Sequence, residues 1–225
     1  MGPGISEVLT FAIGVAISPV PIIAVILMLF SERARVNGPV FLLGWVLALA
    51  VLSGVVYVLG QASNPTTSSS ASDTISWGKI VLGVLLLLAA LRSWRNRPAR
   101  GSEPEMPKWM AGVDALTTWK ALGLGLLLAG VNPKNLILTV GAAAGLAQLG
   151  LSTTDAVVSL IVFVLVASLT IAGPVVYYLV GGAKAKTELD ELKDWLRVHN
   201  AAVMAVLFLV FGVDLIAKGL PPLTS

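Results

Sequence analysis

Cysteine is absent from this chain of 225 residues, and histidine occurs once, at His199. The first absence excludes disulfides, thiolate metal sites and thiol redox chemistry, and a single histidine makes a His-rich metal site untenable. The sequence also lacks a nucleotide-binding loop of the Gly-x-x-x-x-Gly-Lys-Ser/Thr kind, so we expect no ATP hydrolysis. We therefore expect a protein that holds neither a metal ion nor any other cofactor.

Charged residues are scarce as well, at 12% of the chain, whereas hydrophobic residues make up 56% and the mean hydropathy is +0.90. This composition is far too apolar for a soluble domain of such length, and it predicts a protein of the lipid bilayer. No Lys or Arg precedes the first apolar stretch, which we therefore interpret as a retained span rather than a signal peptide. The net charge of +3 then gives no indication of a nucleic-acid partner.

Six apolar segments are candidates to cross a bilayer core, which takes about 20 residues of helix. The third segment is short, and the fourth is long enough to imply a kink or an unwound centre. We therefore predict an all-α polytopic membrane protein with six transmembrane helices, at Ile5 to Phe30, Pro39 to Gly60, Trp77 to Leu91, Trp119 to Gly150, Asp155 to Val180 and Ala201 to Ala217.

Basic residues are distributed unevenly among the connections between these segments. Most of the 15 Lys and Arg residues lie in three alternate connections, at Ser31 to Gly38, Arg92 to Lys120 and Gly181 to Asn200. Connections rich in Lys and Arg stay on the cytoplasmic side of a membrane. The charge pattern therefore predicts that both termini are extracytoplasmic.

Proline clusters interrupt two of the predicted spans, Ser18-Pro19-Val20-Pro21 in the first and Asn132-Pro133-Lys134-Asn135 in the fourth. Proline removes a backbone donor and clashes with the carbonyl one turn back, so a helix breaks there and its freed polar groups need cover. Breaks at corresponding places in two halves of a chain are typical of transporters built from inverted repeats. We therefore predict two inverted three-helix repeats, at 1–94 and 119–225, joined by a cytoplasmic linker at 95–118.

The residues at the two breaks are the candidate site. Lys134 is a mid-span lysine, which suits an anchor for an anionic head group or a carboxylate, although it could instead snorkel or form a static ion pair. Asn132 and Asn135 can bind a polar ligand or satisfy carbonyls that Pro133 frees, and Ser18 has the equivalent place in the first break. We predict substrate contacts from Ser18, Asn132, Lys134 and Asn135, with Pro19, Pro21 and Pro133 as hinges.

Asp214 is the only acidic residue inside the sixth predicted span. Counted from the inner rims of their spans, Asp214 and Lys134 lie at similar depths if both segments stay helical. Two interpretations follow: Asp214 pairs with Lys134 and couples transport to an ion, or it lies at the outer membrane interface.

Several of these segments resemble one known family. The runs Gly14-Val15-Ala16-Ile17-Ser18-Pro19-Val20-Pro21 and Leu43-Gly44-Trp45, a basic linker, and Leu128-Ala129-Gly130-Val131-Asn132-Pro133-Lys134-Asn135 are similar to those of the GAP family. This family comprises glycopeptidolipid- and sulfolipid-addressing proteins of mycobacteria and related actinobacteria, and it falls within the lysine-exporter (LysE) superfamily. The resemblance implies six spans in two inverted repeats, and export of envelope lipids or small solutes across the bacterial inner membrane.

Three functions remain open at this stage. The first is a secondary exporter or translocation component for envelope lipids, acting by alternating access about the two breaks. The second is a small-solute exporter of amino-acid type, and the third is an accessory subunit of a larger lipid-export machine. An enzyme is not indicated, because no pair of deep carboxylates, no serine-histidine pair and no metal cluster is present. We expect membrane lipids as partners, an anionic lipid or small molecule as substrate, and a homodimer through small-residue faces such as Gly141 and Gly145.

Overall fold

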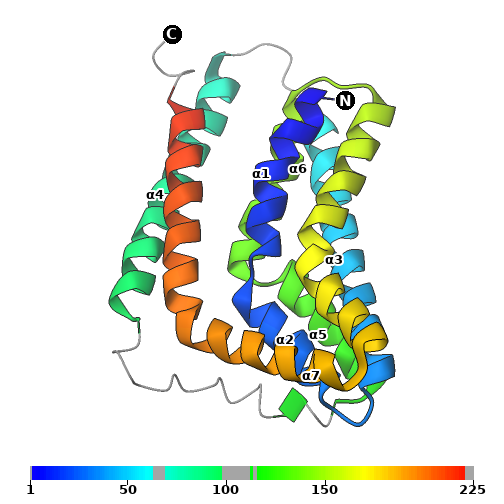
Figure 1. The fold of residues 1–225 in the computed structure, drawn as a ribbon. Helices are drawn as coiled ribbons and strands as arrows, with labels where there is room; N and C mark the ends of the chain where they lie inside the picture. Colours follow the sequence, from blue (N-terminus) through cyan, green and yellow to red (C-terminus); the bar gives the residue numbers. More distant parts are fainter. Residues whose placement is uncertain (1, 63–68, 98–111, 114–115, 221–225) are drawn as a thin grey trace. The chain divides into compact units, whose positions relative to one another are not determined.

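A computed structural model describes residues 2–62, 69–97, 112–113 and 116–220 of the chain. The regular elements of these residues are α-helices (Figure 1), in the order α1 (Gly2–Ala16), α2 (Pro19–Leu29), α3 (Ala34–Ala62), α4 (Ser69–Arg95), α5 (Thr118–Gly130), α6 (Pro133–Gln148) and α7 (Thr153–Gly219). The prediction of an all-α membrane protein is confirmed at this level.

Both predicted helix breaks are present at the proline clusters. The first falls between α1 and α2, which meet at 55°, and the second falls between α5 and α6, which meet at 62°. In each case a proline occupies the start of the second helix, where a missing N–H costs nothing, and it terminates the helix before it.

Three helical segments of the described chain are each long and apolar enough to cross a membrane: Ala34–Ala62, Thr153–Gly182 and Lys184–Gly219. Counting each bent pair as one further span gives up to 5. The predicted third span, Trp77 to Leu91, lies within α4, which is not among these candidates. The count of six spans and the arrangement as repeats stay predictions.

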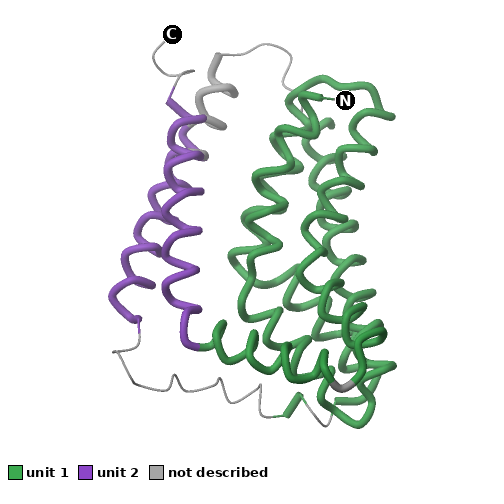
Figure 2. Tube along the Cα trace, viewed as in Figure 1, with its two compact units in different colours: residues 1–63, 105–197 green, residues 64–104, 198–225 purple. Residues whose placement is uncertain are grey.

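The chain divides into two compact units, which Figure 2 colours separately. One unit comprises Met1–Ser63 and Glu105–Arg197, and the other comprises Asn64–Pro104 and Val198–Ser225. Each unit takes segments from both predicted halves, and the division into 1–94, 95–118 and 119–225 stays a prediction. Much of the predicted linker, at 98–111 and 114–115, lies outside the described residues.

Within the first unit the two broken spans run antiparallel. A Cβ on Gly4 would meet Leu146, and one on Gly141 would meet Phe11. Helices α1 and α6 therefore lie side by side and run antiparallel. Correspondingly, α2 contacts α5. This pairing brings the end of α1 to the start of α6, so that the two proline breaks lie at one place.

Helix α3 packs against both α5 and α6. The approach to α5 is close because Gly44 and Gly125 have no side chains: a Cβ on either would collide with backbone atoms of the other helix, at Leu122 and Phe41 respectively. Trp45 and Phe41 are fully buried beside this contact. The close packing fixes α5, and therefore the second break, against α3.

Helix α7 changes direction at Gly182, whose φ of 60° and ψ of −136° lie in a region that favours glycine. After this kink the helix is amphipathic, burying Ala185, Leu189 and Leu196 on one side. Lys193, on the same side, lies 5.5 Å from the centre of the Phe30 ring at the end of α2. This part of α7 therefore packs near the end of α2.

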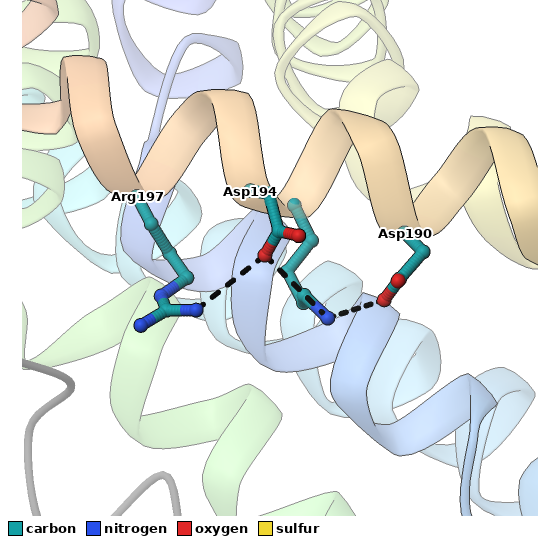
Figure 3. Close-up of polar contacts among 4 residues, drawn as sticks. Asp190, Asp194 and Arg197 are labelled. Carbon is teal, nitrogen blue, oxygen red and sulfur yellow. Dashed lines mark hydrogen bonds and ion pairs between the residues drawn. The ribbon is translucent and has the colours of Figure 1, made fainter. Parts of the chain in front are cut away.

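Charged side chains of the same segment form a chain of ion pairs around Lys193 (Figure 3). Lys193 pairs with Asp190 and lies 3.7 Å from Asp194, whose carboxylate is also 3.4 Å from Arg197. The hydroxyl of Tyr177, before the kink, donates to Glu188 after it at 2.5 Å. These contacts stabilise the turn of α7 at a polar surface, and we assign them no chemistry.

Candidate functional site: the junction of the two helix breaks

The first break leaves several carbonyl oxygens of α1 without their usual donors. In a helix, residue i accepts from the N–H of residue i+4, so Val15 and Ile17 would accept from Pro19 and Pro21, which have no N–H. The N–H of Ser18 would donate to the carbonyl of Gly14 in a continuous helix. It donates to the carbonyl of Ala16 instead, at 2.8 Å, so the carbonyl of Gly14 has no backbone donor. Three buried or half-buried carbonyls therefore need donors from elsewhere.

Lys134 supplies two of those donors from the second break. Its Nζ lies 2.7 Å from the carbonyl oxygen of Gly14 and 2.7 Å from that of Ile17. The Lys134 side chain is only 5% exposed, and a charged donor forms stronger hydrogen bonds than a neutral one. A single ammonium group therefore replaces the missing backbone donors and holds the end of α1.

Ser18 and Asn135 complete the connection between the breaks. The single proton of the Ser18 hydroxyl has two acceptors within reach, the Val15 carbonyl at 2.6 Å and Asn135 Oδ1 at 2.9 Å. Asn135 Nδ2 donates to the carbonyl of Leu128 in α5 at 2.9 Å. Asn135 thus joins the end of α5 to the first break.

Asn132 has a local role at the start of α6. Its Oδ1 accepts from the N–H of Lys134 at 3.1 Å, which is the usual contact of an N-cap, and Pro133 follows as the first helical residue. This geometry places Lys134 and Asn135 in the first turn of α6, from which their side chains reach the first break.

Helix α7 adds a residue that the sequence did not single out. Thr170 Oγ1 donates to the carbonyl of Ala16 at 2.5 Å, so a third helix contributes to the covering of the first break. A threonine in an apolar span usually bonds to its own helix, and nothing in the sequence distinguishes Thr170 from that common case.

Electrostatics favour this arrangement. The carbonyl end of a helix carries partial negative charge, and a cation there gains about 0.3 to 1 kcal/mol at exposed sites and more when partly buried. Lys134 lies at that end of α1, and its contacts are carbonyl dipoles. The junction, which we define as Ser18, Lys134, Asn135 and the α1 carbonyls that they bind, is therefore a polar cluster closed within an apolar bundle.

A family model described as "Sap, sulfolipid-1-addressing protein" matches residues 8–221. The chain belongs to the sulfolipid-1-addressing protein family. No curated protein and no solved structure matches the chain. The family model spans both helix breaks and the whole of α7, so the resemblance inferred from the proline motifs is confirmed over nearly the full chain.

As a member of the sulfolipid-1-addressing protein family, the chain is a multi-pass membrane protein of a lipid-addressing family, and the family description names no reaction. The described residues contain no group of three His, Cys, Asp or Glu side chains that could hold a metal ion. The hydrogen bonds described above join the two helix breaks.

The structure brings together three of the predicted site residues, Ser18, Lys134 and Asn135. Asp214 lies in the second compact unit, where its carboxylate is 3.3 Å from the ammonium of Lys218. A pair between Lys134 and Asp214, and the contact of any of these residues with substrate, stay predictions.

Proposed function

We propose that this protein is a component for exporting envelope lipids across a bacterial inner membrane, and that the junction is its moving part. Membership of a lipid-addressing family supports the lipid cargo. The single observation that carries the mechanism is that Lys134 and Asn135 of the second break bind the first break, at the carbonyl of Gly14 and the hydroxyl of Ser18. In this proposal the chain has six spans in two inverted repeats, with both termini outside the cytoplasm.

The contacts at the junction suit a reversible closure. In a continuous helix the carbonyls accept backbone hydrogen bonds, which break only when the helix unwinds. At the junction the donors are side chains, which can exchange partners by changing rotamer. When α1 and α6 separate, the Lys134 ammonium loses two carbonyl acceptors, and a buried cation without acceptors is costly. An anionic head group then replaces those acceptors, which links opening of the junction to lipid binding.

The closed state of the junction favours a second candidate function. Ser18, Lys134 and Asn135 are exposed by only 2%, 5% and 0%. A junction that never opens suits an accessory subunit, which assists a larger lipid-export machine and does not itself move lipid. Export of a small carboxylate solute is a further alternative, since one ammonium group and backbone dipoles suffice to bind it.

The proposal is tested with the purified full-length chain in phosphatidylcholine vesicles. The probes are a fluorescent sulfated glycolipid and fluorescent phosphatidylcholine, and dithionite added outside bleaches only the label in the outer leaflet. We expect the protein to move the sulfated lipid between leaflets faster than phosphatidylcholine, with or without an imposed pH gradient. The matched variants are Lys134→Met, expected to lose this movement, and Lys120→Met, an exposed lysine on α5 that is expected to keep it.

The alternatives give different results in the same vesicles. Uptake of a radiolabelled amino acid without lipid movement would support the small-solute exporter. Movement of neither probe by a folded protein would contradict autonomous export and support the accessory subunit.

A further inference from the structure

A second feature of the molecule lies in the smaller compact unit, away from the junction. Helix α4 and the last part of α7 pack antiparallel there: a Cβ on Gly83 of α4 would meet Ile216 of α7, whereas one on Gly212 of α7 would meet Leu87 of α4. Further along, the two helices leave a groove of about 490 Å³. The lining of the groove is apolar and includes Leu87, Ala90, Leu91 and Trp94 of α4 and Ala205 and Leu209 of α7.

The groove exists because its floor is made of small residues. Ala90 and Ala205 are 7% and 5% exposed and face each other's helix, while the larger Leu91, Trp94 and Leu209 form the walls and stay about half exposed. A space of this volume is within the range that binds small ligands. Its apolar lining in a membrane helix pair suits a hydrocarbon chain.

One end of the groove is strongly basic. Leu87, Leu91 and Arg95 follow one another at intervals of four, so the apolar row of α4 ends in an arginine. The guanidinium of Arg97 lies 4.1 Å from the centre of the Trp94 ring, which places a second cation directly at the groove. Arg92 is in the same last turn, and the sequence from Lys79 to Arg97 contains no acidic residue.

We propose that this groove binds a bilayer lipid with an anionic head group, the acyl chain lying between α4 and α7 and the head group on Arg95 and Arg97. Charge complementarity selects this occupant: a neutral lipid fills the apolar part equally well and leaves the arginines without an anion. Arginine suits phosphate and sulfate because its planar group donates two parallel hydrogen bonds. The site does not depend on the proposed export function, because it requires only equilibrium binding.

The experiment uses the full-length chain in phosphatidylcholine vesicles and measures quenching of Trp94 by lipids with brominated acyl chains. The contribution of Trp94 is the difference between the native protein and Trp94→Phe, and the two quenchers are brominated phosphatidylglycerol and brominated phosphatidylcholine. We expect phosphatidylglycerol to quench Trp94 at a lower mole fraction. The preference is the ratio of the mole fractions of phosphatidylcholine and phosphatidylglycerol that give equal quenching of Trp94. In Arg97→Gln this ratio should fall by about fivefold, which is the effect of one basic residue near an anionic lipid.

Matched variants separate a site from general surface charge. Arg35→Gln removes one exposed arginine from the other unit and should keep the preference. Ala205→Leu fills the groove and should lower quenching by both lipids, whereas Ala217→Leu, at an exposed position beyond the groove, should not. If Ala205→Leu fails to fold, the comparison of Arg97→Gln with Arg35→Gln still decides the question.

Three results would overturn the proposal. Equal quenching by the two lipids would mean ordinary contact with bulk lipid, and equal losses in Arg97→Gln and Arg35→Gln would mean a diffuse charge effect. Absence of Trp94 quenching by either lipid would mean that the groove is covered, for instance by a second copy of the chain.

Discussion

The Nζ atom of Lys134 lies 2.7 Å from the carbonyl oxygen of Ile17, in the other broken span. Ile17 is the residue whose helical donor would be the N–H of position 21, and that position is a proline. A lysine of the second break thus takes the place of a backbone donor that the first break lacks. This relationship explains how the first proline cluster can lie within an apolar bundle, and it makes the first break depend on the second.

The stability of the fold should depend on this lysine. Lys134→Met keeps the length of the side chain but leaves two carbonyls in the junction without their donor. Hydrogen bonds to a charged group contribute about 1.5 to 3 kcal/mol each, and relief of the buried charge offsets part of the loss, so we expect destabilisation by about 2 kcal/mol. Thermal unfolding of the full-length protein in detergent measures this, with Lys120→Met as the control. Equal effects of the two substitutions would contradict the assignment.

Restoring a backbone donor should make Lys134 less important. Pro21→Ala returns an N–H that can reach the carbonyl of Ile17 if α1 and α2 straighten. We therefore expect Lys134→Met to cost about 1 kcal/mol less in the Pro21→Ala background than in the native chain. The coupling is partial because Lys134 also binds Gly14. Strictly additive effects in the double-mutant cycle would show that the lysine does not substitute for the missing donor.

Two glycines of α5 provide a test of the helix packing that positions the second break. A Cβ on Gly125 would collide with the α3 backbone at Phe41, whereas one on Gly123 would meet nothing within 4 Å. We expect Gly125→Ala to destabilise the protein by about 1 to 3 kcal/mol, the usual cost of overpacking. Gly123→Ala should be neutral or stabilising, since alanine is about 1 kcal/mol more favourable than glycine in the interior of a helix. Similar melting temperatures for the two variants would contradict the close approach of α3 and α5.

The positions of the two breaks could be predicted from sequence because proline acts locally. Pro19 and Pro133 each remove a backbone N–H from their own helix, and this loss does not depend on the tertiary structure. The antiparallel course of α1 and α6 is also what an inverted pair of spans requires, although the repeat itself stays a prediction.

The contacts of Lys134 could not be predicted in the same way. From the sequence, a mid-span lysine suits a ligand, a carboxylate or the membrane surface, because the spacing of residues does not show which carbonyls of another helix lie within reach. Thr170 was missed for the same reason. The break of α7 lies where the predicted fifth span ends, at Val180, but the sequence did not show which of Gly181 and Gly182 would adopt a positive φ.

The most direct test of the central claim is whether export stops while the junction is held shut. The native chain has no cysteine, so Ser18→Cys with Asn135→Cys introduces one unambiguous pair at side chains whose polar atoms are 2.9 Å apart. Leaflet exchange of the fluorescent sulfated glycolipid is measured after oxidation and again after reduction, with each single-cysteine variant as a control. We predict that the oxidised pair blocks exchange and that reduction restores it, while the single variants are insensitive to oxidation. Equal exchange by the oxidised and reduced pair would contradict the claim that the junction must open.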